Sequence, residues 1–217
     1  MNELSISKVF IQKDAIKYDL TNVIIADLKL ESKNIIIVDS IDSINEDYKS
    51  KFLYLFKNNN KVITSCPGTR GFLCCSYFVL NVIEGCPYDC QYCILQDYLK
   101  SNLIKVAVNI NDHIDQVKDF ISNNYFEYYR IGTGELSDSL ALDKFFNYSN
   151  YLIKEFINIP NCYLELKTKS SNVQQLIDSP ISNNIIISWT INLPEIISKV
   201  EKNTATLEER IESIQLA

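Results

Sequence analysis

Apolar positions along the chain fall into short runs that alternate with longer amphipathic segments. The β-branched run at 34–38 predicts a strand, and the apolar face of 47–57 predicts a helix after it. Later strands are expected at 77–83, 104–110, 128–131, 163–168 and 185–191, and helices at 92–100, 113–122, 140–156, 171–177 and 206–216. Nearly continuous apolar strands that alternate with helices indicate an α/β fold with a parallel sheet covered by helices.

A loop near residue 70 divides this pattern. Asn58-Asn59-Asn60 ends the first unit, and the segment at 66–71 contains two glycines and a proline, as loops do. We therefore expect a small N-terminal α/β region at 1–70 and a larger βα region at 71–217.

Composition narrows the class of protein. With 217 residues, of which 47% are hydrophobic, the chain is long enough to bury a substantial core. No apolar stretch reaches the roughly 18 residues that span a bilayer, and the first residues lack a signal-peptide pattern, so we expect a cytoplasmic protein without a membrane partner. The net charge of -6 provides no global basic field for nucleic acid.

The seven cysteines are odd in number and clustered, which favours reduced thiols and metal ligation over disulfides. Cys86, Cys90 and Cys93 form a C-x3-C-x2-C triplet, one ligand short of a closed site. A 4Fe-4S cluster held by three cysteines leaves one iron free, whereas electron-transfer clusters and structural zinc normally use four protein ligands. The spacing therefore predicts a cluster that performs chemistry.

Zinc is the alternative, with a fourth ligand from Cys66, Cys74 or Cys75. Zinc modules favour paired C-x2-C knuckles, which this triplet lacks, so the iron–sulfur interpretation is preferred. The one histidine, His113, follows Asn111-Asp112 at an expected helix start, and we expect a surface or capping position rather than a ligand.

Other motifs follow the predicted strands, at the edge where parallel βα folds bind ligands. Gly132-Thr133-Gly134-Glu135 follows one strand, Lys167 and Lys169 end another, and Ser188 belongs to a third. Each also has a structural interpretation: a tight turn, solvated lysines and a satisfied core hydroxyl. Their shared position predicts one pocket with the cysteine loop.

The triplet also carries a family resemblance. With aromatic Tyr92 directly before the third cysteine, it resembles the signature of radical S-adenosylmethionine (SAM) enzymes. Within that superfamily, the stretch from Cys66 to Gln96 is similar to the spore photoproduct lyase-like family, and segments 132–142, 168–169 and 201–211 continue the likeness. The resemblance implies a partial parallel (β/α) barrel of the radical SAM type at 71–217, which lacks its C-terminal part.

The resemblance also implies cofactors and roles. A 4Fe-4S cluster on the three cysteines would reductively cleave SAM to a 5'-deoxyadenosyl radical that abstracts hydrogen. Tyr92 would lie by the adenine, and the segment Gly132, Thr133, Gly134 and Glu135 would receive the methionine ammonium. Lys169 would pair with the methionine carboxylate, with Lys167 as the alternative, and Ser188 would hydrogen-bond the same ligand.

The implied partners are a reductant such as flavodoxin or ferredoxin and DNA that contains a thymine dimer. Two departures concern the substrate: glycine stands at 132, where these lyases carry a hydrogen-donating cysteine, and Ile94 stands where they have a tyrosine. The alternatives are a radical SAM enzyme that modifies another substrate and a degenerate noncatalytic iron–sulfur protein. Because the family continues past the segment that matches 210–212, we expect either a fragment or a partner chain that covers the open barrel edge.

Overall fold

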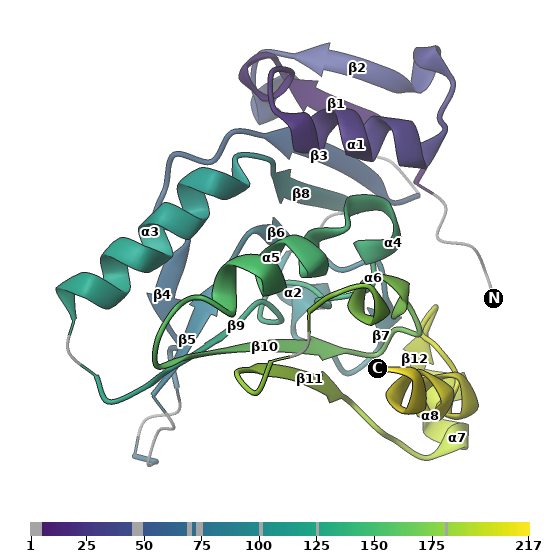
Figure 1. Cartoon of the computed structure of the whole chain (residues 1–217). Coiled ribbons are helices and arrows are strands. Elements are labelled where there is room, and N and C mark those ends of the chain that lie inside the picture. Colours follow the sequence, from purple (N-terminus) through teal and green to yellow (C-terminus); the bar gives the residue numbers. More distant parts are fainter. Residues whose placement is uncertain are drawn as a thin grey trace.

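Two five-stranded β-sheets share one hydrophobic core in the described part of the chain (Figure 1). The computed structural model describes residues 6–44, 50–68, 71–72, 76–99, 102–124, 126–180 and 182–217. No helix among these residues is long and apolar enough to cross a bilayer.

The first sheet has the strand order β2-β1-β3-β8-β6. Its members are β1 (Val9–Gln12), β2 (Ile35–Val38), β3 (Phe52–Phe56), β6 (Ile83–Glu84) and β8 (Leu103–Ala107). β2, β1, β3 and β8 are parallel, and β6 runs antiparallel to β8. The order reverses between β1 and β3, because the chain leaves β1 toward β2 on one side and later returns to β3 on the other.

Two long helices follow strands of this sheet. α1 (Asp19–Leu28) connects β1 to β2 and ends where Lys29 adopts a φ of 50°, and α3 (Ile110–Asn123) follows β8. Short 3-10 turns cover Lys13–Ala15, Ser32–Asn34 and Ile41–Ser43.

The second sheet has the order β11-β10-β9-β5-β4. Its members are β4 (Ile63–Ser65), β5 (Tyr77–Leu80), β9 (Tyr129–Gly132), β10 (Cys162–Thr168) and β11 (Ile185–Trp189). All are parallel except β4, which runs antiparallel to β5. The carboxyl ends of four strands therefore meet at one edge, and their loops are brought together there.

Helices cover one face of this sheet. α4 (Asp143–Phe146) and α5 (Tyr148–Phe156) are separated by Asn147 at a φ of 50°, and α6 (Gln174–Ile177) follows β10. Buried side chains of α5 such as Phe156 pack in the same cluster as Leu164 of β10. The opposite face carries polar side chains.

The C-terminal segment returns to the cysteine loop. β7 (Asp89–Cys90) pairs antiparallel with β12 (Glu201–Lys202), between α7 (Pro194–Val200) and α8 (Leu207–Leu216). α8 begins with a capping box, in which the Thr206 hydroxyl accepts from the Glu209 backbone N–H and the Glu209 carboxylate accepts from the Thr206 N–H. A four-residue helix, α2 (Leu95–Tyr98), follows the cysteines.

The structure confirms the predicted parallel α/β pattern and four of the five later strands. The range 77–83 is divided between β5 of the second sheet and β6 of the first, and one predicted helix was wrong. Residues 52–56 of the helix expected at 47–57 form β3, while 45–49 lie outside the described residues. Phe52 and Tyr54 pack in one hydrophobic cluster and Leu53 and Leu55 in another, so both faces of β3 are buried. A strand buried on both faces reads as a continuous apolar run, which periodicity does not distinguish from a helix.

The division near residue 70 stays a prediction. β4 lies before residue 70 and joins the second sheet, whereas β6 and β8 lie after it and join the first. Chain segments from both sides of the loop therefore contribute to both sheets.

The expectation for His113 was wrong. α3 begins at Ile110, so His113 lies on its buried face with Ile114 and Val117. The side chain is 0% exposed, and among the described residues neither ring nitrogen has a hydrogen-bond partner. Burial lowers the pKa of His113 to about 4, although the charge of Asp112 opposes this.

We predict a pH dependence of stability from His113. The unfolded chain binds a proton near pH 6.5, whereas the folded chain stays neutral at this position down to about pH 4. Its contribution is therefore complete above pH 6.5 and is lost as the pH falls toward 4, by up to about 3 kcal/mol.

The measurement is urea unfolding of the wild type and His113→Leu at pH 7, 5.5 and 4. The variant should lose less stability between pH 7 and pH 4 than the wild type. Equal losses in the two proteins would show that His113 does not titrate on unfolding.

Candidate active site

A cavity of about 140 Å³ lies at the carboxyl edge of the second sheet. Cys86, Cys90 and Cys93 line it together with residues from the loops after β9, β10 and β11. The other lining residues are Tyr88, Ile94, Leu95, Gly134, Glu135, Ser137, Asp138, Lys167, Thr168, Lys169 and Thr190. The edge that the sequence predicted as the ligand site thus contains a cavity.

Gly85 fixes the start of the cysteine loop. It adopts a φ of +104°, and a Cβ on it would lie 2.7 Å from the carbonyl oxygen of Leu103. Its N–H donates to the Leu136 carbonyl (2.9 Å), and its own carbonyl accepts from the Ser137 hydroxyl (3.0 Å). Only glycine satisfies both the dihedral angle and the close approach, and the two hydrogen bonds join the cysteine loop to the loop after β9.

The other end of the cysteine loop is held by β12. Cys90 lies opposite Glu201 in the register of β7 and β12, and the Gln91 N–H donates to the Val200 carbonyl (2.9 Å). Asn203 donates from its amide to the Asp89 carboxylate (2.8 Å). The cysteines are therefore fixed between two segments that lie far apart in the sequence.

Burial disfavours the thiolate forms of Cys86 and Cys90. Burial raises the pKa of Cys86 to about 12 and that of Cys90 to about 11, the latter in spite of the nearby Lys169 charge. Metal binding would therefore release protons from this site.

The donor set fits a cluster better than a single ion. Within the described part of the chain, no three His, Cys, Asp or Glu side chains converge on one metal position. Structural zinc requires such convergence, whereas each thiolate of an iron–sulfur cluster binds a different iron. Of the fourth-ligand candidates for zinc, Cys66 is not among the residues that line the cavity, and Cys74 and Cys75 lie outside the described residues.

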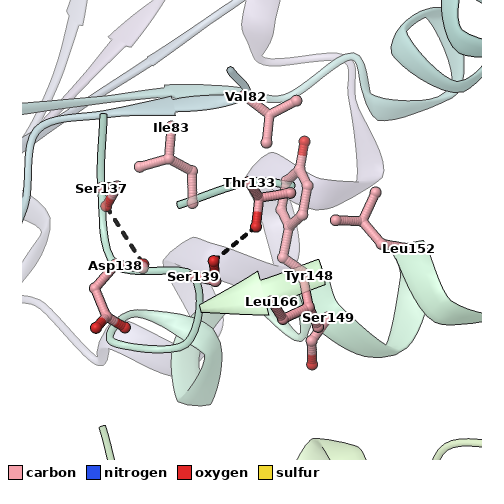
Figure 2. Close-up of a pocket in the computed structure, with 10 residues that line it drawn as sticks. All are labelled: Val82, Ile83, Thr133, Ser137, Asp138, Ser139, Tyr148, Ser149, Leu152 and Leu166. Atoms are coloured by element: carbon pink, nitrogen blue, oxygen red, sulfur yellow. Dashed lines mark hydrogen bonds between the residues drawn. The ribbon is translucent and has the colours of Figure 1, made fainter. Parts of the chain in front are cut away.

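The loop after β9 is attached to β10 through Ser139. Thr133 donates from its hydroxyl to Ser139 Oγ (2.8 Å), which also accepts from the Lys167 N–H (3.1 Å). Figure 2 shows the Thr133 and Ser139 side chains pointing toward one another, beside the ring of Tyr148 in a small cavity behind the loop. Thr133 therefore orients the loop from behind, while Gly134 and Glu135 line the cysteine cavity.

Asp138 is the main hydrogen-bond acceptor of this loop. Its carboxylate accepts from the Thr168 hydroxyl (2.7 Å) and from the backbone N–H groups of Lys169 (2.6 Å), Leu140 (3.0 Å) and Ala141 (2.9 Å). Burial raises its pKa, and the hydrogen bonds oppose that rise. The sequence interpretation missed Asp138; the signal was a Ser-Asp pair one residue after the glycine motif.

Gly132 faces the other side of the sheet. A Cβ on Gly132 would lie 1.5 Å from the hydroxyl oxygen of Tyr77, so the Tyr77 ring occupies the space of any side chain at position 132. Beside it, Glu165 is 3% exposed and forms an ion pair with Arg130 (3.0 Å). Ser188 donates its hydroxyl to the same carboxylate (2.9 Å), as the structural interpretation of this serine expected.

A second network joins the exposed ring of Tyr92 to a buried ion pair. Its ring lies 5.8 Å from Lys169 Nζ, and its hydroxyl donates to the carboxylate of Glu201. Glu201 in turn forms an ion pair with Arg210 (2.7 Å), and both side chains are 0% exposed. Arg210 also donates to the Thr190 carbonyl (2.8 Å), so the network connects β12, α8 and the end of β11.

The structure thus brings together part of the predicted set. The three cysteines, Gly134, Glu135 and Lys169 line one cavity, as does the alternative Lys167. Gly132, Thr133, Tyr92 and Ser188 do not line it, although Tyr92 lies against Lys169. The predicted ligand roles stay predictions. At the end of β11, the residue that lines the cavity is Thr190, two residues after Ser188.

The family model "Spore photoproduct lyase" matches residues 5–216. The chain belongs to the spore photoproduct lyase family. A spore photoproduct lyase of Clostridium acetobutylicum is 24% identical over 162 residues, which are 73% of this chain and 48% of the relative. The Bacillus subtilis enzyme is 27% identical over 137 residues, or 63% of this chain and 40% of the relative.

Solved structures of the spore photoproduct lyase family share the fold. A spore photoproduct lyase complexed with dinucleoside spore photoproduct matches with a TM-score of 0.85 at 19% identity, over 98% of this chain and 64% of that chain. A variant with bound AdoMet and dinucleoside spore photoproduct matches with a TM-score of 0.84. The expected mixed α/β fold is confirmed, and the chain spans about half the length of the curated relatives.

We predict that the Arg210–Glu201 pair is essential for stability. Arg210→Met leaves a buried carboxylate without its cation and should lower the free energy of unfolding by about 3–5 kcal/mol. Lys202→Met removes an exposed cation of β12, directly after Glu201, and should change it by less than about 0.5 kcal/mol.

The measurement is urea unfolding followed by circular dichroism. The double variant Glu201→Gln with Arg210→Met should recover part of the loss, because the unpaired charge is gone. A loss in Arg210→Met no larger than in Lys202→Met would contradict the assignment.

Proposed function

We propose that this chain is a radical SAM enzyme that holds a 4Fe-4S cluster on Cys86, Cys90 and Cys93. The observation that carries the proposal is a cavity lined by these three cysteines, two carboxylates and two lysines, where no other described cysteine contributes. When bound, the cluster supplies the electron that cleaves SAM to a 5'-deoxyadenosyl radical.

The residues around the cavity would bind and orient SAM. The ammonium of Lys169 would pair with the methionine carboxylate, and Lys167 is the alternative because both line the cavity. The Gly132 to Glu135 segment would receive the methionine ammonium, with the Glu135 carboxylate on the lining and held by Asn81 (2.8 Å).

The remaining predicted contacts involve rings and hydroxyls. Tyr92, which is 54% exposed, would offer its ring to the adenine, while Glu201 fixes its hydroxyl. Ser188 remains the predicted hydroxyl partner of SAM, and Thr190 is the cavity-lining alternative.

Related solved structures support a substrate class. Spore photoproduct lyases are described with dinucleoside spore photoproduct, and we extend this to DNA that contains a thymine dimer as the substrate of this chain. The observation that favours a different radical reaction is Tyr77, which fills the space where a cysteine at position 132 would stand.

We also propose the partners and organisation that accompany this function. A flavodoxin or ferredoxin would supply the electron. The proposed domains are the N-terminal α/β region at 1–70 and the βα region at 71–217. β11 has a strand neighbour on one side only among the described strands, so a strand from a partner chain would cover its edge.

The cluster assignment is tested by one substitution. Cys90→Ala should abolish the visible absorbance of the anaerobically reconstituted cluster, because a two-cysteine site does not hold it. Cys66→Ala, which removes a thiol that does not line the cavity, should retain the absorbance. Full absorbance in Cys90→Ala would refute the ligand set.

SAM cleavage is tested with the reconstituted protein. After reduction with dithionite and addition of SAM, chromatography should detect 5'-deoxyadenosine. Lys169→Met should raise the KM for SAM roughly tenfold, and Lys167→Met should change it less than twofold. An intact cluster without cleavage would favour the noncatalytic alternative.

The substrate is tested in the same reaction. Dinucleotide spore photoproduct is added, and release of thymidylyl-thymidine is measured. Cleavage of SAM without this release would favour the alternative of another substrate.

A further inference from the structure

A second, larger cavity of about 430 Å³ lies away from the cysteines. No residue lines both cavities. Its walls come from the start of α1, the start of α3 and the α4–α5 junction. Its volume falls within the roughly 300–1,000 Å³ that is typical of small-molecule sites.

Its position in the fold is that of a ligand site. The residues that line it at 17–23 follow β1, and those at 108–112 follow β8, so the cavity lies beyond the carboxyl ends of the first parallel sheet. In the order β2-β1-β3-β8, the lining residues follow β1 and β8, the two strands that flank β3. Parallel α/β sheets bind ligands, mononucleotides among them, beyond the carboxyl ends of their strands.

The charged groups of the cavity have complementary tasks. Lys17 and Lys154 form no salt bridge with any described residue, so both ammonium groups are available for an anion. Asp112 already accepts from the Asn109 side chain (2.8 Å), whereas Asp19 in the first turn of α1 has no such contact among the described residues. A ligand with a phosphate and free hydroxyl groups would use both charge types.

The uncharged walls suit a flat ring. Tyr18 and Tyr151 line the cavity with Leu20 and Val23, and Tyr151 donates its hydroxyl to Asn111 from across the α3–α5 gap. Tyr148 adds a buried part of this wall, while its ring lies beside Thr133 in the small cavity behind the loop after β9.

We propose that this cavity is a second ligand site, which binds a mononucleotide independently of the cysteine cavity. The phosphate pairs with Lys17 and Lys154, the Asp19 carboxylate accepts from the ribose hydroxyls, and the base lies against the tyrosine and aliphatic walls. The start of α3 adds backbone N–H donors near the phosphate.

The test is isothermal titration of the full chain with AMP, GMP, CMP and UMP, with adenosine and inorganic phosphate as separate probes. At least one monophosphate should bind at least tenfold more tightly than adenosine or phosphate alone. Lys17→Ala and Lys154→Ala should each weaken binding roughly tenfold. Lys144→Ala, a nearby lysine of α4 that does not line the cavity, should leave binding within twofold.

Excess SAM and removal of the cluster separate this site from the cysteine cavity. The affinity for the monophosphate should be the same with the cluster loaded or absent and with SAM in excess. Competition by SAM, equal binding of phosphate alone, an equal effect of Lys144→Ala, or no binding of any monophosphate would each overturn the proposal. None of these outcomes bears on SAM cleavage, which is measured separately.

Discussion

The candidate active site depends on a single half-buried carboxylate. Asp138 accepts hydrogen bonds from the end of β10 and from two N–H groups of its own loop, and thereby fixes the loop after β9 to the loop after β10. Separation of the two loops would leave the Asp138 carboxylate without its hydrogen-bond donors, which is energetically costly. The hydrogen bonds therefore hold the two loops together. The side chains of Glu135 and Lys169 line the cavity from these two loops, and their separation is therefore a property of the fold.

The cysteine loop is built on this frame from two sides. Gly85 joins it to Leu136 of the same β9 loop, and Cys90 pairs with Glu201 of the C-terminal segment. Glu201 is in turn neutralised by Arg210, which lies fully buried in α8. The geometry of the three thiols therefore depends on contacts across more than a hundred residues of sequence, although the cysteines themselves lie within eight residues.

These long-range contacts explain which parts of the fold and of the site could be predicted from the sequence. Strand ends and the cysteine spacing are local signals, so the parallel pattern, the ligand-binding edge and the grouping of Cys86 with Lys169 were predictable. β3 was predicted as a helix because both its faces are buried. His113 was predicted to lie at a helix start, but α3 begins three residues earlier, at Ile110, and this places His113 on the buried face. Asp138 and Arg210 belong to no periodic sequence pattern. Their importance arises from their burial and their hydrogen-bond and ion-pair partners, which only the fold reveals.

The polar face of the second sheet limits what chemistry can occur beside the cavity. Tyr77 lies over Gly132 so closely that a side chain there would collide with its hydroxyl, and Glu165 lies beside Tyr77 with Arg130 and Ser188. Burial, followed by the Glu165 charge, raises the pKa of Tyr77. The Tyr77 phenol therefore stays neutral, and a neutral hydroxyl is not repelled by the neighbouring Glu165 carboxylate. A side chain at position 132 would therefore have to displace the Tyr77 hydroxyl from its place beside Glu165.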